Sequence, residues 1–356
     1  MESEISNKIT FLPHIHFFRG FAILLIVGVH SLISLPWNQN EISKLVFYSI
    51  TNNGTILFVF IAGYLFYYLN STQFSFRRYF KKKVLYVLSP YVFCSIPAIV
   101  EKLYFDSGTQ WYMNEKFELM PNFIKVLYFL ATGRHFGPFW FIPMIFIFYL
   151  ISPALIKFSK WKYFNYAVLM ILLAGFFTVQ FGFYSSVPLS FIHFLPVYLM
   201  GMLISRFDIV FLSNKFIKFI PIAVFLFIST LELLGYVSIQ NVIDLRDQNY
   251  LTLAFNPSMV KSVFLCLLML QVFHYFSNKR NRLWKILGDY SFGIFFIHLY
   301  IIIIFQKLVM MKLITFTHFN ALTYVIYIMV LLTINLLLVY LFKKIFKKSS
   351  RILIGS

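Results

Sequence analysis

The feature that most constrains this fold is a series of apolar runs, each long enough to cross a bilayer as a helix. A spanning helix needs about 20 predominantly apolar residues. The sequence contains ten runs close to that length: 17 to 35, 46 to 69, 84 to 101, 138 to 157, 164 to 182, 188 to 205, 216 to 238, 258 to 276, 290 to 306 and 320 to 342. They predict an all-α polytopic membrane protein, a single bundle of about ten transmembrane helices.

The composition agrees with a protein that lies almost entirely in the membrane. Of the 356 residues, 60% are apolar and only 12% are charged, whereas soluble domains are far less apolar. The longest polar stretch, residues 101 to 121, is too short to fold by itself outside the bilayer. We therefore expect one membrane-embedded domain over residues 1 to 356 and no separate soluble domain.

The basic residues indicate topology rather than a nucleic-acid partner. The net charge is +19, but the lysines and arginines fall in short clusters between the apolar runs, as the positive-inside rule expects of cytoplasmic loops. An even number of spans with most clusters inside puts both termini in the cytoplasm. The start of the chain lacks a basic segment and a cleavage site, so we expect the first run to be retained as a helix.

The cysteines and histidines do not indicate a metal site. Cys94 and Cys266 both lie within apolar runs, where a thiol behaves as a small apolar side chain. No cluster has the spacing of metal ligands or of a disulfide framework. We expect no metal.

The first apolar run carries two ionisable residues, Arg19 and His30. Such side chains inside a spanning helix are costly and are a functional hypothesis by default. Eleven residues at 100° each make three turns plus about 20°, so both side chains project from one face, about 16 Å apart along the axis. A long ligand can lie there, with a charged end at Arg19 and a reactive end at His30. The alternative is an arginine that extends to the membrane surface and a histidine that is merely hydrogen-bonded.

Other apolar runs also contain polar residues. His298 lies about ten residues into the ninth run, which places it near mid-membrane, at a depth similar to that of His30. Two histidines at one depth can line one pocket, where a neutral imidazole can act as general base towards a hydroxyl nucleophile. The others are candidates for interhelical hydrogen bonds: His193, Glu232, Gln180, Gln271 and Gln306.

The densest basic cluster is FRRYFKKK, residues 76 to 83, which we expect to form a cytoplasmic loop. Topology alone accounts for it, but arginine and lysine side chains also recognise phosphates. The candidates for binding a phosphorylated donor are Arg77, Arg78, Lys82 and Lys83. The chain has no P-loop or glycine-rich nucleotide motif, so side chains are expected to hold any nucleotide.

Five stretches, in order, resemble the acyltransferase-3 family, the membrane-bound O-acyltransferases of bacterial surface glycans. FFRGFAILLIVGVH, which contains Arg19 and His30, is similar to the first-helix signature, and FVFIAG, 58 to 63, to the second-helix pattern. The basic segment followed by SPY, 89 to 91, resembles the family's basic cluster before a third helix. FWFIP, 139 to 143, is similar to its W-F-L segment, and SFGIFFIH, 291 to 298, to its ninth-helix motif. The resemblance covers nearly the whole chain.

The resemblance implies a multi-pass enzyme of the bacterial plasma membrane that takes an acyl group from cytoplasmic acyl-CoA, usually acetyl-CoA, with succinyl transfer as an alternative. The acceptor is a hydroxyl of a surface polysaccharide or lipid-linked saccharide. His30, Arg19 and His298 are then the catalytic candidates. We expect the sugar itself to enter the outer half of the bundle, without a soluble acyl-carrier partner, and to contact Trp140, His193 and Glu232. Membrane lipid is a further expected partner, and self-association is left open.

The alternative function is a glycan or lipid transporter or flippase. In that case Arg19, His30 and Glu232 would form a proton-coupled or anion-binding path through the membrane. Transporters commonly contain internal repeats with broken helices, and this sequence contains no repeat. Acyl transfer is therefore the favoured prediction.

Overall fold

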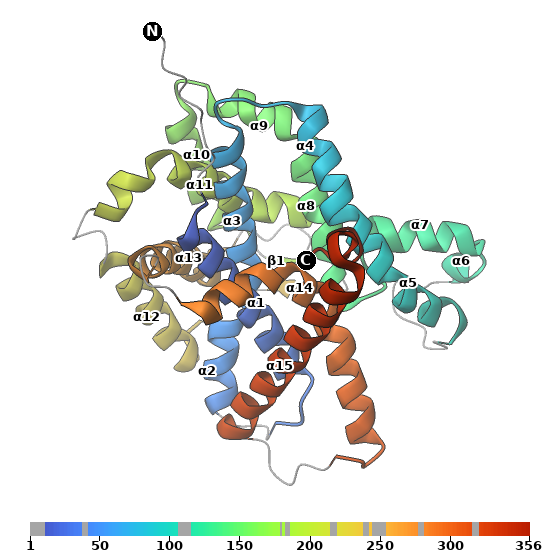
Figure 1. Ribbon diagram of the computed structural model, residues 1–356. Helices are drawn as coiled ribbons and strands as arrows, with labels where there is room; N and C mark the ends of the chain where they lie inside the picture. Colours follow the sequence, from blue (N-terminus) through green and yellow to red (C-terminus); the bar gives the residue numbers. More distant parts are fainter. Residues whose placement is uncertain are drawn as a thin grey trace.

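The computed structural model describes residues 11–37, 42–105, 115–178, 180–181, 186–213, 219–237, 242–243, 254–276, 281–314 and 320–356. The elements in these residues are helices, as expected, apart from one pair of parallel two-residue strands, β1 (Gln180–Phe181) and β2 (Val242–Ile243). Figure 1 shows the helices gathered around a common centre.

Seven segments of the described chain are helical, long and apolar enough to cross a membrane. Four are single helices: α1 (Pro13–Ile33), α11 (Val187–Ser213), α13 (Pro257–Phe276) and α14 (Arg282–Met310). Three are composite: α2 (Ile42–Thr51) with α3 (Gly54–Asn70), α4 (Phe76–Lys83) with a π-helical turn (Val84–Leu88) and α5 (Ser89–Tyr104), and α15 (Ala321–Phe346) with a 3₁₀ turn (Lys347–Ser349) and α16 (Ser350–Leu353).

The expected count of ten spans is not confirmed. A 3₁₀ turn (Gly137–Trp140) leading into α8 (Phe141–Leu150) forms an eighth span only if it is counted with α9 (Ser152–Ser159), from which it is bent by 56°. Two expected spans form shorter helices, α10 (Phe164–Gly175) and α12 (Phe219–Leu233). The helix α7 (Asn122–Thr132) is too short to cross, as expected, and α6 (Glu115–Glu118) is a single turn. The cytoplasmic location of the termini stays a prediction.

The basic segment 76 to 83 is a helix, not the loop that we expected. It forms α4 and continues through the π-helical turn into α5. Pro90 does not interrupt this helical segment because it lies in the first turn of α5, where the backbone N–H that proline lacks has no partner within that helix. A π-helical turn inserted between two helices is often found beside functional sites.

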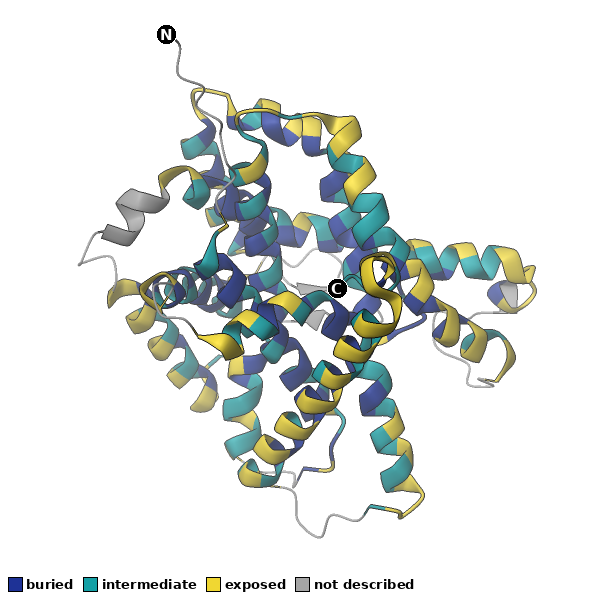
Figure 2. Ribbon diagram, viewed as in Figure 1, coloured by how far each residue is buried: buried dark blue, intermediate teal, exposed yellow. Residues whose placement is uncertain are grey.

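The helix α1 lies at the centre of the protein and packs against α2, α3, α13, α14 and α15. Its residues Phe18, Ala22, Ile23 and Val27 are completely buried. Figure 2 shows buried residues along α1 and exposed ones along the outer helices, such as α15. The exposed residues of α15 include large apolar side chains such as Met329, as expected of a face that contacts lipid tails.

Glycines allow the central helices to approach closely. A Cβ atom on Gly63 of α3 would lie 2.0 Å from the carbonyl oxygen of Tyr198, and one on Gly201 of α11 would lie 2.3 Å from the carbonyl oxygen of Phe60. Small residues at such crossings are what membrane helices use to bring their backbones together. The α3–α11 contact therefore depends on these two glycines.

Candidate active site

The site is built where α1 crosses α14. At one end, Arg19 donates a hydrogen bond from Nη2 to Ser291 Oγ, 2.9 Å away. At the other end, His30 Nδ1 lies 3.3 Å from His298 Nε2. Ser291 and His298 begin and end the SFGIFFIH stretch of α14, so both polar residues of α1 face the same helix. This agrees with the one-face arrangement expected from their spacing.

Two glycines set the distance between α1 and α14. A Cβ on Gly20 would lie 3.0 Å from Leu287 Cβ, and one on Gly288 would lie 2.5 Å from the carbonyl oxygen of His16. Larger residues would push the helices apart at the Arg19 end. The close approach lets short polar side chains on α14 reach those on α1.

The hydrogen bonds of the two histidines fix their tautomers. His30 Nδ1 lies 2.8 Å from the carbonyl oxygen of Ile26, and His298 Nδ1 lies 2.9 Å from that of Phe295. A carbonyl oxygen only accepts, so we assign a hydrogen to Nδ1 of each ring. His298 Nε2 then carries a lone pair directed at the Nδ1–H of His30, and His30 Nε2 carries a second lone pair.

This arrangement makes His30 the ring that can exchange a proton. Among the described residues none donates to or accepts from His30 Nε2, and the side chain is half-buried, whereas His298 is completely buried. A proton taken up at Nε2 would give an imidazolium whose Nδ1–H is already hydrogen-bonded to Ile26 and to His298. His298 thus orients and stabilises His30, and its expected catalytic role stays a prediction.

A second pair of residues lies near Arg19. His16 Nε2 is 3.1 Å from Asp289 Oδ1 and also 3.1 Å from the carbonyl oxygen of Lys285. Asp289 attracts Arg19 electrostatically. Sequence reasoning missed Asp289, although it lies two residues before Ser291, in the helix that carries the recognised motif.

The four basic candidates for donor binding have different surroundings. Arg77, Arg78 and Lys82 are exposed, while Lys83 is half-buried. The ammonium group of Lys83 lies over two aromatic rings, 4.6 Å from the centre of Tyr149 and 5.3 Å from that of Tyr79. It is also close enough to Arg19 for the two charges to repel. Lys83 is therefore the member of the group that faces the site.

Trp140 and His193, two of the candidates for acceptor binding, both contact the ring of Phe194. Trp140 stacks on Phe194, with ring centres 5.9 Å apart and planes at 24°. The ring of His193 also contacts Phe194, and His193 Nδ1 lies 3.1 Å from Thr178 Oγ1. His193 is buried and Trp140 is half-buried, so Trp140 is the more accessible of the two.

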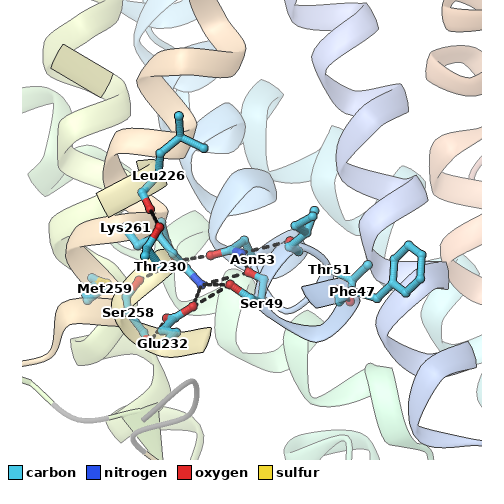
Figure 3. Close-up of polar contacts among 12 residues, drawn as sticks. Phe47, Ser49, Thr51, Asn53, Leu226, Thr230, Glu232, Ser258, Met259 and Lys261 are labelled. Carbon is cyan, nitrogen blue, oxygen red and sulfur yellow. Dashed lines mark hydrogen bonds and ion pairs between the residues drawn. The ribbon is translucent and has the colours of Figure 1, made fainter. Parts of the chain in front are cut away.

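Glu232, the third acceptor candidate, belongs to a buried polar cluster (Figure 3). Its Oε2 lies 2.6 Å from Lys261 Nζ and accepts from Ser49 Oγ at 2.6 Å, and its Oε1 accepts from Ser258 Oγ at 3.1 Å. Glu232 is 3% exposed and Lys261 is 2% exposed. Both carboxylate oxygens are thus occupied, and the carboxylate is shielded from solvent. Sequence reasoning overlooked Lys261, a lysine inside the apolar run 258 to 276.

The cluster stabilises the break between α2 and α3. Lys261 Nζ and Asn53 Nδ2 both donate to the carbonyl oxygen of Ser49, at 2.9 and 2.7 Å, and Asn53 Nδ2 also donates to that of Ile50 at 2.9 Å. A break in a spanning helix frees carbonyl oxygens that need donors within the protein. The break packs on α1, because a Cβ on Gly54 would lie only 2.9 Å from Ile26. Ile26 is the residue whose carbonyl orients His30.

The described residues contain no group of three or more side chains suited to hold a metal ion. A search of curated proteins finds no match, and no solved structure matches. The family comparison does: the model of the acyltransferase-3 family, described as an acyltransferase domain, matches residues 12–346. The matched region contains the α1–α14 crossing and both of its histidines, so this chain belongs to the acyltransferase-3 family and is a membrane acyltransferase.

Proposed function

We propose that the protein transfers an acyl group, in the simplest case acetyl, from acyl-CoA to a hydroxyl of a cell-surface polysaccharide or its lipid-linked precursor. The observation that carries the proposal is the half-buried His30, with its Nε2 lone pair available and a buried histidine hydrogen-bonded behind it. That is the arrangement a general base needs when a weak hydroxyl nucleophile must be activated.

The reaction needs one proton to move twice. His30 Nε2 takes the proton of the acceptor hydroxyl while the hydroxyl oxygen attacks the thioester carbonyl carbon. The carbon–sulfur bond then breaks, and the imidazolium returns the proton to the leaving thiolate. The products are an ester and the free thiol of CoA. The hydrogen bonds from Nδ1 to Ile26 and His298 keep the ring oriented through both steps.

Arg19 has a different role in this proposal. It lies three helical turns from His30, about 16 Å along α1, and is too far away to take part in the proton transfer. A guanidinium group is suited to hold an anionic group of the donor. The acyl-CoA molecule would then lie along α1, with its phosphate-bearing part near Arg19 and its thioester near His30.

The acceptor is proposed to approach from the opposite end of α1. Trp140 offers a half-buried indole, and sugar rings pack well on aromatic faces. His193 is buried against Phe194, the ring on which Trp140 stacks, and the carboxylate oxygens of Glu232 are already occupied. Trp140 is therefore the strongest of the three candidates for a sugar contact, and transfer is direct, without an acylated protein carrier. The proposed location is the bacterial plasma membrane.

The test uses the purified protein in detergent with acetyl-CoA labelled in the acetyl group. The enzyme should release or transfer label slowly without acceptor and faster when a candidate glycan is added, and succinyl-CoA in a parallel reaction identifies the acyl group. His30→Gln should lose both reactions. A protein that binds glycan but never consumes any acyl-CoA would contradict the proposal.

A further inference from the structure

The segment that follows α15 folds back onto the protein. The thiol of Cys94 donates to the carbonyl oxygen of Leu353 at 3.6 Å, and the backbone N–H of Gly293 donates to Ser356 Oγ at 2.8 Å. Ser350 Oγ donates to the carbonyl oxygen of Ser356 at 2.6 Å, which closes the segment on itself. Figure 1 shows this end of the chain near the middle of the molecule, beside α14.

Packing also holds the segment in place. Ile354 is only 1% exposed. A Cβ on Gly355, where φ is +78°, would lie 2.3 Å from a ring carbon of Phe292, and a Cβ on Gly293 would lie 2.7 Å from Ser356 Oγ. A tail that only sets membrane orientation by its charge needs no such fit. The segment therefore holds its side chains at fixed places in the protein.

The segment brings Arg351 to the Arg19 end of the site. The guanidinium carbon of Arg351 lies 4.2 Å from the ring centre of Tyr86, which belongs to the π-helical turn that directly follows Lys83. Both Arg351 and Lys83 repel Arg19 electrostatically. Two cations from separate parts of the chain thus lie within electrostatic reach of Arg19.

In the described part of the chain, one carboxylate offsets the charge of Arg19, and none acts on Lys83. Asp289 is the carboxylate that attracts Arg19, and it is also paired with His16. Lys83 and Arg351 rest on aromatic rings, which attract a cation but leave its N–H groups available. Placing three cations together is costly unless an anion binds among them. The cluster is therefore suited to a phosphate-bearing ligand.

We propose that Arg351, carried by the docked segment after α15, forms together with Lys83 and Arg19 the binding site for the phosphate groups of the acyl-CoA donor. This inference rests on the proposed function, and it makes the segment 350–356 a part of the donor site. The guanidinium of Arg351 lies over the ring of Tyr86, and a planar guanidinium can donate two parallel hydrogen bonds to a phosphate.

The test compares acetyl-CoA with S-acetylpantetheine, which lacks the phosphates together with the adenosine that carries them. S-acetylpantetheine has the thioester but no phosphate, whereas acetyl-CoA has both. Arg351→Gln should lower the preference for acetyl-CoA over S-acetylpantetheine, measured as the ratio of their kcat/KM values, by about tenfold to a hundredfold, as expected for the loss of charge-assisted hydrogen bonds. The loss should lie mainly in KM, because binding energy lost equally from ground and transition states raises KM.

Matched variants distinguish a specific role of Arg351 in donor binding from a general effect of positive charge. Lys348→Gln removes a positive charge from an exposed residue of the preceding 3₁₀ turn and should leave the donor preference unchanged. Lys83→Met, which keeps an unbranched apolar side chain between the two rings, should lower the preference as Arg351→Gln does, and Arg351→Lys should restore part of it.

Three results would decide against the inference. Equal losses with both donors would show that Arg351 acts only on folding or packing. If Lys348→Gln lowered the donor preference as much as Arg351→Gln, Arg351 would contribute only through net charge. Wild-type protein that consumes neither donor would instead overturn the proposed function itself, and the inference with it.

Discussion

At the scale of single residues, the pairing of His30 with another histidine instead of a carboxylate suits a site inside a membrane. A carboxylate behind the base would be a permanent charge in a low-dielectric region, where ionised groups are costly. His298 is completely buried and presents only a lone pair to His30, so the pair is neutral until a proton arrives. The stabilising hydrogen bond is nevertheless in place when His30 becomes charged.

Replacing His30 tests its role as the base. His30→Ala should lower kcat by about 10²- to 10⁴-fold, the usual contribution of a general base, while membrane levels stay near those of the wild type. The measurement is glycan acylation with saturating acyl-CoA. His274→Ala, which removes an exposed histidine of α13, is the control and should retain activity. Near-normal activity of His30→Ala would show that another residue acts as the base.

Replacing His298 tests its role as the orienting partner. His298→Phe keeps an aromatic ring of similar size but removes the acceptor that faces His30 Nδ1. The loss of a hydrogen bond to a charged group costs about 1.5–3 kcal/mol, so kcat should fall about 10- to 150-fold, less than in His30→Ala. The double variant separates the roles: if His298 acts through His30, the two losses should not add. Additive losses would indicate that His298 acts independently.

The sequence predicts the chemistry-bearing residues better than their partners. Arg19, His30 and His298 stand out because ionisable side chains are rare in apolar runs, and helical spacing correctly places the first two on one face. Ser291 and Ile26 give no such signal. The former is a common small residue, and the latter contributes only a carbonyl group, so the tautomer of His30 follows from the three-dimensional arrangement alone.

At the scale of secondary-structure elements, the break between α2 and α3 links the periphery to the site. It is held on one side by Lys261 and Glu232 and packs on the other against α1 at Ile26 and Gly28. The position of the Ile26 carbonyl, and through it the orientation of His30, depends on this contact. The sequence shows only one continuous apolar run, 46 to 69, because Asn52 and Asn53 are too short an interruption to divide it.

The ion pair of this break can be tested by stability. Removing one partner, in Glu232→Gln or Lys261→Met, leaves the other charge buried and should destabilise the protein by about 3–5 kcal/mol. Replacing both by apolar residues, in Glu232→Leu with Lys261→Met, should restore much of the loss. Thermal melting in detergent gives the comparison. Glu101→Gln is the control: its pair with Lys307 is long, at 3.8 Å, and about half-exposed, so its loss should cost less than about 1 kcal/mol. Equal melting temperatures for all variants would refute this account of the cluster.

Apolar runs predict where helices lie but not where they stop. The seven helical segments long enough to span coincide with seven of the ten expected runs. The run 164 to 182 continues beyond α10, which ends at Gly175, and the run 216 to 238 contains Gly235, whose φ of +78° follows the end of α12. Conversely, the basic residues of α4 remain helical because hydropathy measures the transfer of side chains into lipid, whereas helix formation depends on the backbone.

At the scale of the whole molecule, the proposed donor-phosphate site and the proposed base lie at different levels along α1. The cation cluster of Arg19, Lys83 and Arg351 marks one end, and His30 lies three turns further along the helix. In the predicted orientation, the first end faces the cytoplasm, where acyl-CoA is found. In the proposed reaction, one helix thus brings together a donor from one side of the membrane and a sugar from the other.

Direct transfer across the membrane can be tested in liposomes that contain only this protein. An attacking hydroxyl must come within about 3 Å of both the base and the thioester carbon, so no acylated carrier is needed when the sugar itself reaches His30. Labelled acyl-CoA enclosed in the vesicles should therefore acylate a candidate glycan or lipid-linked saccharide added outside. Vesicles with His30→Ala are the control for leakage. If acylated glycan appeared only after a second, extracytoplasmic protein was added, transfer would proceed through a carrier, because the sugar would then not reach the base by itself.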